Sequence, residues 1–102
     1  MREQKQGAKR VMKPCVWIVG RCPKKLERNF MELSRSYRTP VARCRNIREM
    51  AELLYYAQYP SILICGSNVA SVRSGMKRPV PILMAKDPMA GRCLENHLKY
   101  VL

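Results

Sequence analysis

The segment "SILICGSNVASVRSG" (residues 61–75) contains, in order, an apolar run, a glycine and the beginning of a helix. Residues 62–65 form a continuous apolar run, which is typical of a strand covered on both faces. Gly66 ends the run, and Ser67 or Asn68 can cap a short helix. Many α/β proteins hold phosphate where a strand leads through a glycine into a helix, so the segment raises the question of an anion site.

Strand and helix alternate over the rest of the chain. Apolar runs at 15–19, 40–44, 61–65 and 80–84 predict four strands. Apolar residues with helical spacing follow three of them: Leu26, Phe30, Leu33 and Tyr37; then Ile47, Met50, Leu54 and Ala57; then Ala90, Leu94, His97 or Leu98, and Val101. This order predicts a three-layer α/β domain, flavodoxin-like or Rossmann-like, with a four-stranded parallel sheet and helices on both faces.

Two prolines indicate the order of the strands. Pro40 opens the second run and Pro81 lies inside the fourth. Proline is tolerated at the edges of a sheet but not in its middle. The first and third runs contain no proline and are the most apolar, so we expect the order 2-1-3-4.

Two polar pairs indicate where helices begin. Asn46 with Glu49 resembles a capping box. Asp87 and Pro88 fit an N-cap and the first position of a helix.

The length and the N-terminal composition bound the domain organisation. A chain of 102 residues predicts one domain. Residues 1–13 contain five basic residues and one acid, which predicts a flexible basic arm ahead of a domain at 14–102. No apolar run approaches the roughly 20 residues of a membrane span, and the arm lacks the apolar centre of a secretory signal. We therefore expect a cytoplasmic protein without a membrane partner.

The net charge is +13, from 20 Lys and Arg against 7 acids. Such a charge indicates a polyanionic partner, although it can also serve solubility alone. Ligands of open parallel sheets bind outside the carboxyl ends of the strands, near the reversal of strand order, which here lies between the first and third strands. We call the loops at these carboxyl ends the rim. The sequence places six basic residues on it, against Asp87 alone: Arg21, Lys24, Lys25, Arg43, Arg45 and Lys86.

Helix N-termini add partial positive charge to the rim, and Ser67 and Asn68 would add neutral donors. The rim is therefore predicted to be electropositive and to bind anions. The turn "GSNVAS" (66–71) matches neither G-x-G-x-x-G nor a Walker loop, so a plain helix cap remains an alternative reading of it.

The sequence offers no catalytic, metal or cofactor site. Five cysteines without zinc-knuckle spacing are typical of buried, reduced thiols, although Cys22 and Cys65 could approach each other across the rim. A metal would need three or four converging ligands, and the single histidine, His97, lies far along the last helix. Most acids fall within the predicted helices, so no pair of carboxylates is placed for acid–base chemistry. We expect a protein that is not an enzyme.

Two further groups of residues could contact nucleic acid. Tyr55, Tyr56 and Tyr59 cluster late in the second helix and could stack on bases, although packing in the core is the commoner use of such a cluster. Five arginines with no acid among them form either a solvated face or the flank of a nucleic-acid footprint: Arg35, Arg38, Arg43, Arg45 and Arg48.

The segment "YPSILICGSNVASVRSGMKRPVPILMAKDPMAGRCLENHL" (59–98) carries a resemblance of the stretch from 46 to 98 to the N-terminal sensory domain of propionate-catabolism activators. In that family a helix leads into a strand, a glycine turn, a short helix, an Ile-Pro-Val strand and a last helix. This chain has "CGSN" (65–68) where the family has an Arg-Gly-Gly turn. The resemblance implies regulation and ligand sensing rather than catalysis.

Together these features predict a regulatory domain whose rim and arm bind a polyanion, above all the nucleic-acid backbone, in a salt-dependent manner. The first alternative is a sensor that binds a small anionic metabolite in the crevice between the first and third strands. Such a sensor needs only the rim, whereas a nucleic-acid binder also needs the arm from Lys5 to Lys13. The second alternative is an interaction module that forms a homodimer through the edge of the fourth strand.

Overall fold

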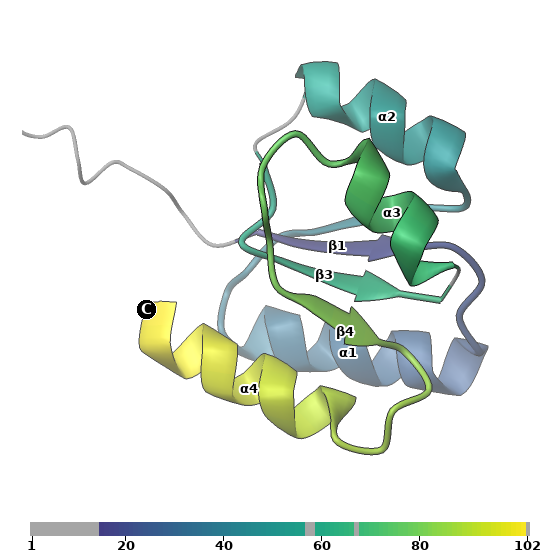
Figure 1. The fold of residues 1–102 in the computed structure, drawn as a ribbon. Helices are drawn as coiled ribbons and strands as arrows, with labels where there is room; N and C mark the ends of the chain where they lie inside the picture. The colour runs from purple at the N-terminus through teal and green to yellow at the C-terminus, as the bar shows by residue number, and fades with distance from the viewer. Residues whose placement is uncertain (1–14, 57–58, 67, 102) are drawn as a thin grey trace, which may run out of the picture.

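The computed structural model describes residues 15–56, 59–66 and 68–101, apart from the side chain of Val101. Strands and helices alternate through them as expected (Figure 1). The elements are β1 (Val16–Val19), α1 (Lys24–Ser36), β2 (Val41–Cys44), α2 (Ile47–Tyr56), β3 (Ile62–Cys65), α3 (Val69–Gly75), β4 (Ile82–Met84) and α4 (Ala90–Val101). The predicted arm at 1–13, Ala57 and Ser67 lie outside the described residues.

The four strands form one parallel sheet in the order β2-β1-β3-β4, which confirms the order expected from the prolines. Both edge strands use proline in the same way. The carbonyl of Pro40 accepts a hydrogen bond from Val16 N–H, and that of Pro81 accepts one from Leu63 N–H, each at 3.0 Å. Pro81 itself precedes β4, which begins at Ile82, because proline has no N–H to donate.

The central strands β1 and β3 are buried over their whole length, so both faces of the sheet are covered. Figure 1 shows α1 and α4 on one face and α2 and α3 on the other. Alternate residues of β1 point to opposite faces. On one face, Val16 and Ile18 pack with Phe30, Leu94 and Leu98; on the other, Trp17 and Val19 pack with Met50 and Val72.

Polar side chains hold the turns that lead into α2 and α4. Asn46 Oδ1 accepts the N–H of Glu49 at 2.9 Å, so the expected cap of α2 is confirmed. Asp87 Oδ1 accepts the N–H of Met89 at 2.9 Å. Helix α4 begins only at Ala90, so the expected N-cap at Asp87 and first helical position at Pro88 are wrong, and both residues lie in the turn before the helix.

The two ends of the sheet carry different segments of the chain. The rim lies at the carboxyl ends of the strands, on the right of Figure 1. The opposite end holds the C-terminal end of α2, the loop between α3 and β4, and Cys15, where the described chain begins. Among the described residues, no helix has the length and apolar character to cross a membrane.

Candidate nucleic-acid interface

Five of the six rim cations are exposed to solvent; Arg45 is paired with Glu49, and the other four are Arg21, Lys24, Lys25 and Lys86. They come from the loop after β1, the first turn of α1 and the loop after β4. Within the described ranges, no ion pair joins them to a carboxylate; the ion pairs there involve Arg43 and Arg45 instead. The four charges are therefore available to a ligand.

Arg43 lies on β2, but its guanidinium is bound within the fold. Its Nε lies 3.1 Å from Glu27 Oε1 on α1, and only 24% of its side chain is exposed. Its Nη1 donates to the carbonyls of Ile18, at 3.2 Å, and Cys44, at 2.7 Å. Arg43 therefore ties β2 to β1 and α1, and the structure places its charge in the fold rather than on the open rim.

Arg45 is different, because 82% of its side chain is exposed. Its Nε and Nη2 donate to Glu49 Oε2 at 3.1 and 3.0 Å, and its backbone N–H donates to Oε1 at 2.6 Å. Hydrogen bonds from the backbone and the side chain of Arg45 hold the pKa of Glu49 below its ordinary value. The charge of Arg45 is therefore paired with Glu49, in the first turn of the helix that follows it.

The crevice between β1 and β3 is filled by backbone. Gly66 N–H donates to the carbonyl of Val19 at 2.8 Å. A Cβ atom on Gly66 would lie 1.8 Å from the carbonyl oxygen of Arg21, so only glycine fits there. Gly20 makes this approach possible by adopting a φ of 90°. The wall facing Gly66 is therefore a hydrogen-bond acceptor, which repels an oxyanion.

Asn68 acts as a helix cap. Its Oδ1 accepts the N–H of Ser71 at 3.1 Å, at the start of α3. The alternative prediction of a plain helix cap is therefore confirmed for Asn68. Ser67, which was expected to donate to an anion, lies outside the described residues. In the described residues of this turn, Gly66 faces a carbonyl and the side chain of Asn68 is used as a cap, so neither is arranged as in a phosphate loop.

Two thiols near the rim, those of Cys22 and Cys44, have raised pKa values. Burial raises the pKa of Cys44 to about 11 and also raises that of Cys22, against the opposing charge of Arg43. Both thiols are therefore protonated at neutral pH and are weak nucleophiles and ligands. In the part of the chain that the structure describes, no group of three or more His, Cys, Asp or Glu residues could hold a metal ion.

His97 is half-buried at the opposite end of the sheet. Its Nε2 lies 3.0 Å from Ser61 Oγ, and this hydroxyl donates to the carbonyl of Cys15 at 3.1 Å. Since the hydroxyl has one proton, His97 Nε2 is assigned as the donor to Ser61. Burial lowers the pKa of His97. The contact holds α4 against the starts of β1 and β3, and the histidine is not placed as a base.

The tyrosines form a feature of their own at this opposite end. Tyr55 and Tyr56 are 75% and 86% exposed, so a core role is wrong for both. Their rings lie 6.5 Å apart at an angle of 61°. Tyr59 is half-buried 6.4 Å from Trp17, and its hydroxyl accepts Arg78 N–H at 2.8 Å and donates to the Arg78 carbonyl at 2.7 Å.

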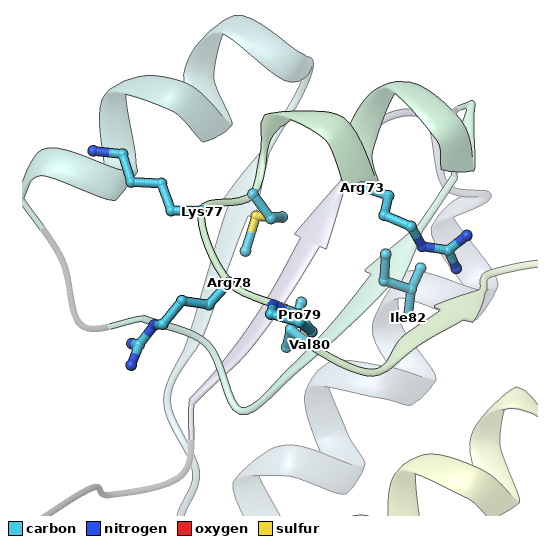
Figure 2. Close-up of a pocket in the computed structure, with 7 residues that line it drawn as sticks. Arg73, Lys77, Arg78, Pro79, Val80 and Ile82 are labelled. Carbon is cyan, nitrogen blue, oxygen red and sulfur yellow. The ribbon is translucent and has the colours of Figure 1, made fainter.

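Cations from the α3–β4 region surround these rings. Lys77 Nζ lies 5.1 Å from the centre of the Tyr55 ring, and Arg78 Cζ lies 4.4 Å from that of Tyr59. Figure 2 shows Lys77 and Arg78 on one side of a cavity of about 260 Å³ and Arg73 on the other. The floor consists of Met76, Pro79, Val80 and Ile82. We call the exposed set the tyrosine surface: Tyr55, Tyr56, Tyr59, Arg73, Lys77 and Arg78.

Arg73, Lys77 and Arg78 were not among the residues expected from the sequence to bind anions. One signal could have pointed to them: no acid occurs from residue 53 to residue 86, although four cations do. The contact between Tyr59 and Arg78 spans 19 positions and depends on the path of a loop, which no spacing rule describes.

Comparisons with known proteins give no match: no family model, no curated protein and no solved structure is similar to this chain. The resemblance to the sensory domain of propionate-catabolism activators therefore stays a prediction.

Proposed function

We propose that this protein binds nucleic acid through phosphate contacts at the rim and does not catalyse a reaction. One observation carries the proposal: Arg21, Lys24, Lys25 and Lys86 are exposed together at one end of the sheet, without carboxylate partners among the described residues. The nearby carboxylates of Glu27 and Glu49 are already engaged by Arg43 and Arg45. An external polyanion can supply the missing negative charge.

A nucleic-acid backbone suits this arrangement better than a small anionic metabolite does. The crevice where a metabolite would bind is filled by the Arg21 carbonyl against Gly66. The four cations instead come from separate loops, and spaced phosphates can contact all of them. The net charge of +13 and the basic residues of the arm, Lys5 to Lys13, add to the attraction. Because the proposed protein binds nucleic acid without catalysing a reaction, we assign it a regulatory role in this proposal.

The test is fluorescence anisotropy with short labelled DNA and RNA at several salt concentrations. We expect tight binding at low salt and a steep loss with added salt. Lys24→Ala with Lys25→Ala should lower the slope of log K against log salt by roughly 1.5, since each phosphate contact contributes about 0.7–0.9.

The matched control is Arg35→Ala with Lys99→Ala, two exposed cations outside the rim with the same total charge. This control should leave the slope closer to that of the wild type. An absence of binding at low salt, or equal losses in both double variants, would contradict the proposal that the rim is the phosphate site.

A further inference from the structure

We infer that the tyrosine surface binds unpaired bases, so that the preferred partner is single-stranded nucleic acid. This inference rests on the proposed function and specifies its ligand. It adds a base-stacking site at the end of the sheet opposite the rim.

The first argument is the exposure of the aromatic rings. Tyr55 and Tyr56 keep 75% and 86% of their surface exposed on the last turn of α2. Aromatic side chains usually bury most of their area, and two adjacent exposed rings mark an interaction surface. Their inclined arrangement, at 61°, presents two different faces rather than one closed stack. Bases could stack on these faces.

The second argument is the charge around the rings. Lys77 contacts the Tyr55 ring, and Arg78 contacts the Tyr59 ring, so cations already lie beside aromatic faces. Arg73 adds a third charge across the cavity, whose floor is apolar (Figure 2). Bases stacked on tyrosines with phosphates at neighbouring cations is the usual arrangement in proteins that bind single strands. A purely apolar protein partner would not need the three cations.

The third argument is the way the surface is held. Tyr59 fixes the loop through two hydrogen bonds to the backbone of Arg78. Tyr59 also packs near Trp17, which is fully buried in the core. The loop that carries the cations is therefore attached to the sheet, and the surface is organised before a ligand arrives, which lowers the entropic cost of binding.

The fourth argument is the position of Cys15, where the described chain begins. Ser61 N–H donates to the carbonyl of Cys15 at 2.8 Å, so the described chain begins beside the start of β3. Tyr59 lies two residues before Ser61. Cys15 therefore lies at the end that carries the tyrosines, and five basic residues precede it in the sequence, within 1–13.

The preference for single strands follows from access to bases. In a duplex the bases stack on one another, and their faces are closed to a protein side chain. Phosphate contacts alone would explain the cations but not the exposed rings. A strand with unpaired bases can use both, whereas a duplex can use the cations only.

The experiment compares binding of one labelled oligonucleotide as a single strand and as a duplex. The variants are Tyr55→Leu with Tyr56→Leu, which removes the rings but keeps apolar side chains, and Tyr55→Phe with Tyr56→Phe, which keeps the rings. Tyr100→Leu is the control, because Tyr100 is 89% exposed but lies on α4. Thermal unfolding of each variant confirms that the fold is intact.

We expect the wild type to prefer the single strand. The Leu pair should weaken single-strand binding by about 5- to 150-fold for each stacked base that is lost. The Phe pair and Tyr100→Leu should bind as the wild type does, and duplex binding should change little in all variants. Salt-dependent binding that is equal for both forms and unaffected by the Leu pair would overturn this inference and leave the proposed function standing. Absence of any nucleic-acid binding would overturn both.

Discussion

The two ends of the sheet carry positive charge in different surroundings. At the rim, cations stand beside acids, and two of them are paired: Arg43 with Glu27, and Arg45 with Glu49. At the tyrosine surface, the cations stand beside aromatic rings, in a segment without acids from 53 to 86. The rim is closed by backbone at its centre, whereas the opposite end has an open cavity with an apolar floor.

The difference shows that position in the fold does not decide by itself where a ligand binds. The carboxyl ends of parallel strands are the usual site, and the reversal of strand order lies there in this protein too. Yet the Gly66 contact uses that crevice to hold two loops together. Under the proposed function, the exposed charges of the rim contact phosphates, and the stacking of bases is proposed for the other end.

The largest expected effect is that of Gly66→Ala. The added methyl group would lie 1.8 Å from the Arg21 carbonyl oxygen, which is backbone and cannot rotate away. The loops after β1 and β3 must then separate, and we expect a loss of at least about 3 kcal/mol in the free energy of unfolding. Urea denaturation measures it.

Gly91→Ala is the matched control, since a Cβ there meets nothing within 4 Å and the residue lies in helix α4. It should stabilise the protein by about 0.5 kcal/mol. A Gly66→Ala protein as stable as the wild type would show that the crevice can open, and would revive it as a binding site.

Arg43→Ala is expected to have the next largest effect. The change leaves Glu27 without its cation and removes two hydrogen bonds to the carbonyls of Ile18 and Cys44. The free energy of unfolding should fall by about 1–3 kcal/mol. Arg43→Lys should restore little, because one ammonium group cannot reproduce the geometry of the guanidinium.

Arg45→Ala serves as the comparison, because its ion pair is largely exposed and should contribute only about 0–1 kcal/mol. Urea denaturation and anisotropy on the same samples separate the two roles. If Arg43→Ala weakened nucleic-acid binding without lowering stability, Arg43 would be a ligand contact rather than a structural residue.

The sequence was sufficient for the architecture because strand burial and proline placement are local properties. The apolar runs predicted β1 and β3 as the centre, and Pro40 and Pro81 predicted the edges. The cap by Asn46 was also readable, since its partner, Glu49, is only three residues away.

The site was less predictable because it depends on contacts between distant segments. Nothing in the spacing of Glu27 and Arg43 shows that a side chain of α1 meets a side chain of β2. The closure at Gly66 likewise depends on the path of the loop after β1. The exposure of Tyr55 and Tyr56 was easier to predict, because neither residue belongs to the apolar stripe of α2.

The smallest expected effect is the pH dependence of the melting temperature that arises from His97. Burial lowers the pKa of His97 below its ordinary value of about 6.5. In the window just below that value the unfolded chain binds more protons than the folded one, so acidification favours unfolding. The melting temperature should be nearly constant between about pH 7.5 and 8, below the titration of the unfolded thiols, and should fall modestly as the pH drops through 6.5.

His97→Gln should remove this slope, because glutamine can still donate to Ser61 but does not titrate. Glu49 titrates in a separate pH range. Because its pKa is lowered in the folded protein, the stability it contributes is lost only as the pH falls below its ordinary pKa of about 4.3, so the effects of Glu49 and His97 can be told apart. A melting temperature that rose as the pH fell from about 7 to 5 would contradict the lowered pKa of His97, because it would mean that the folded state prefers the imidazolium.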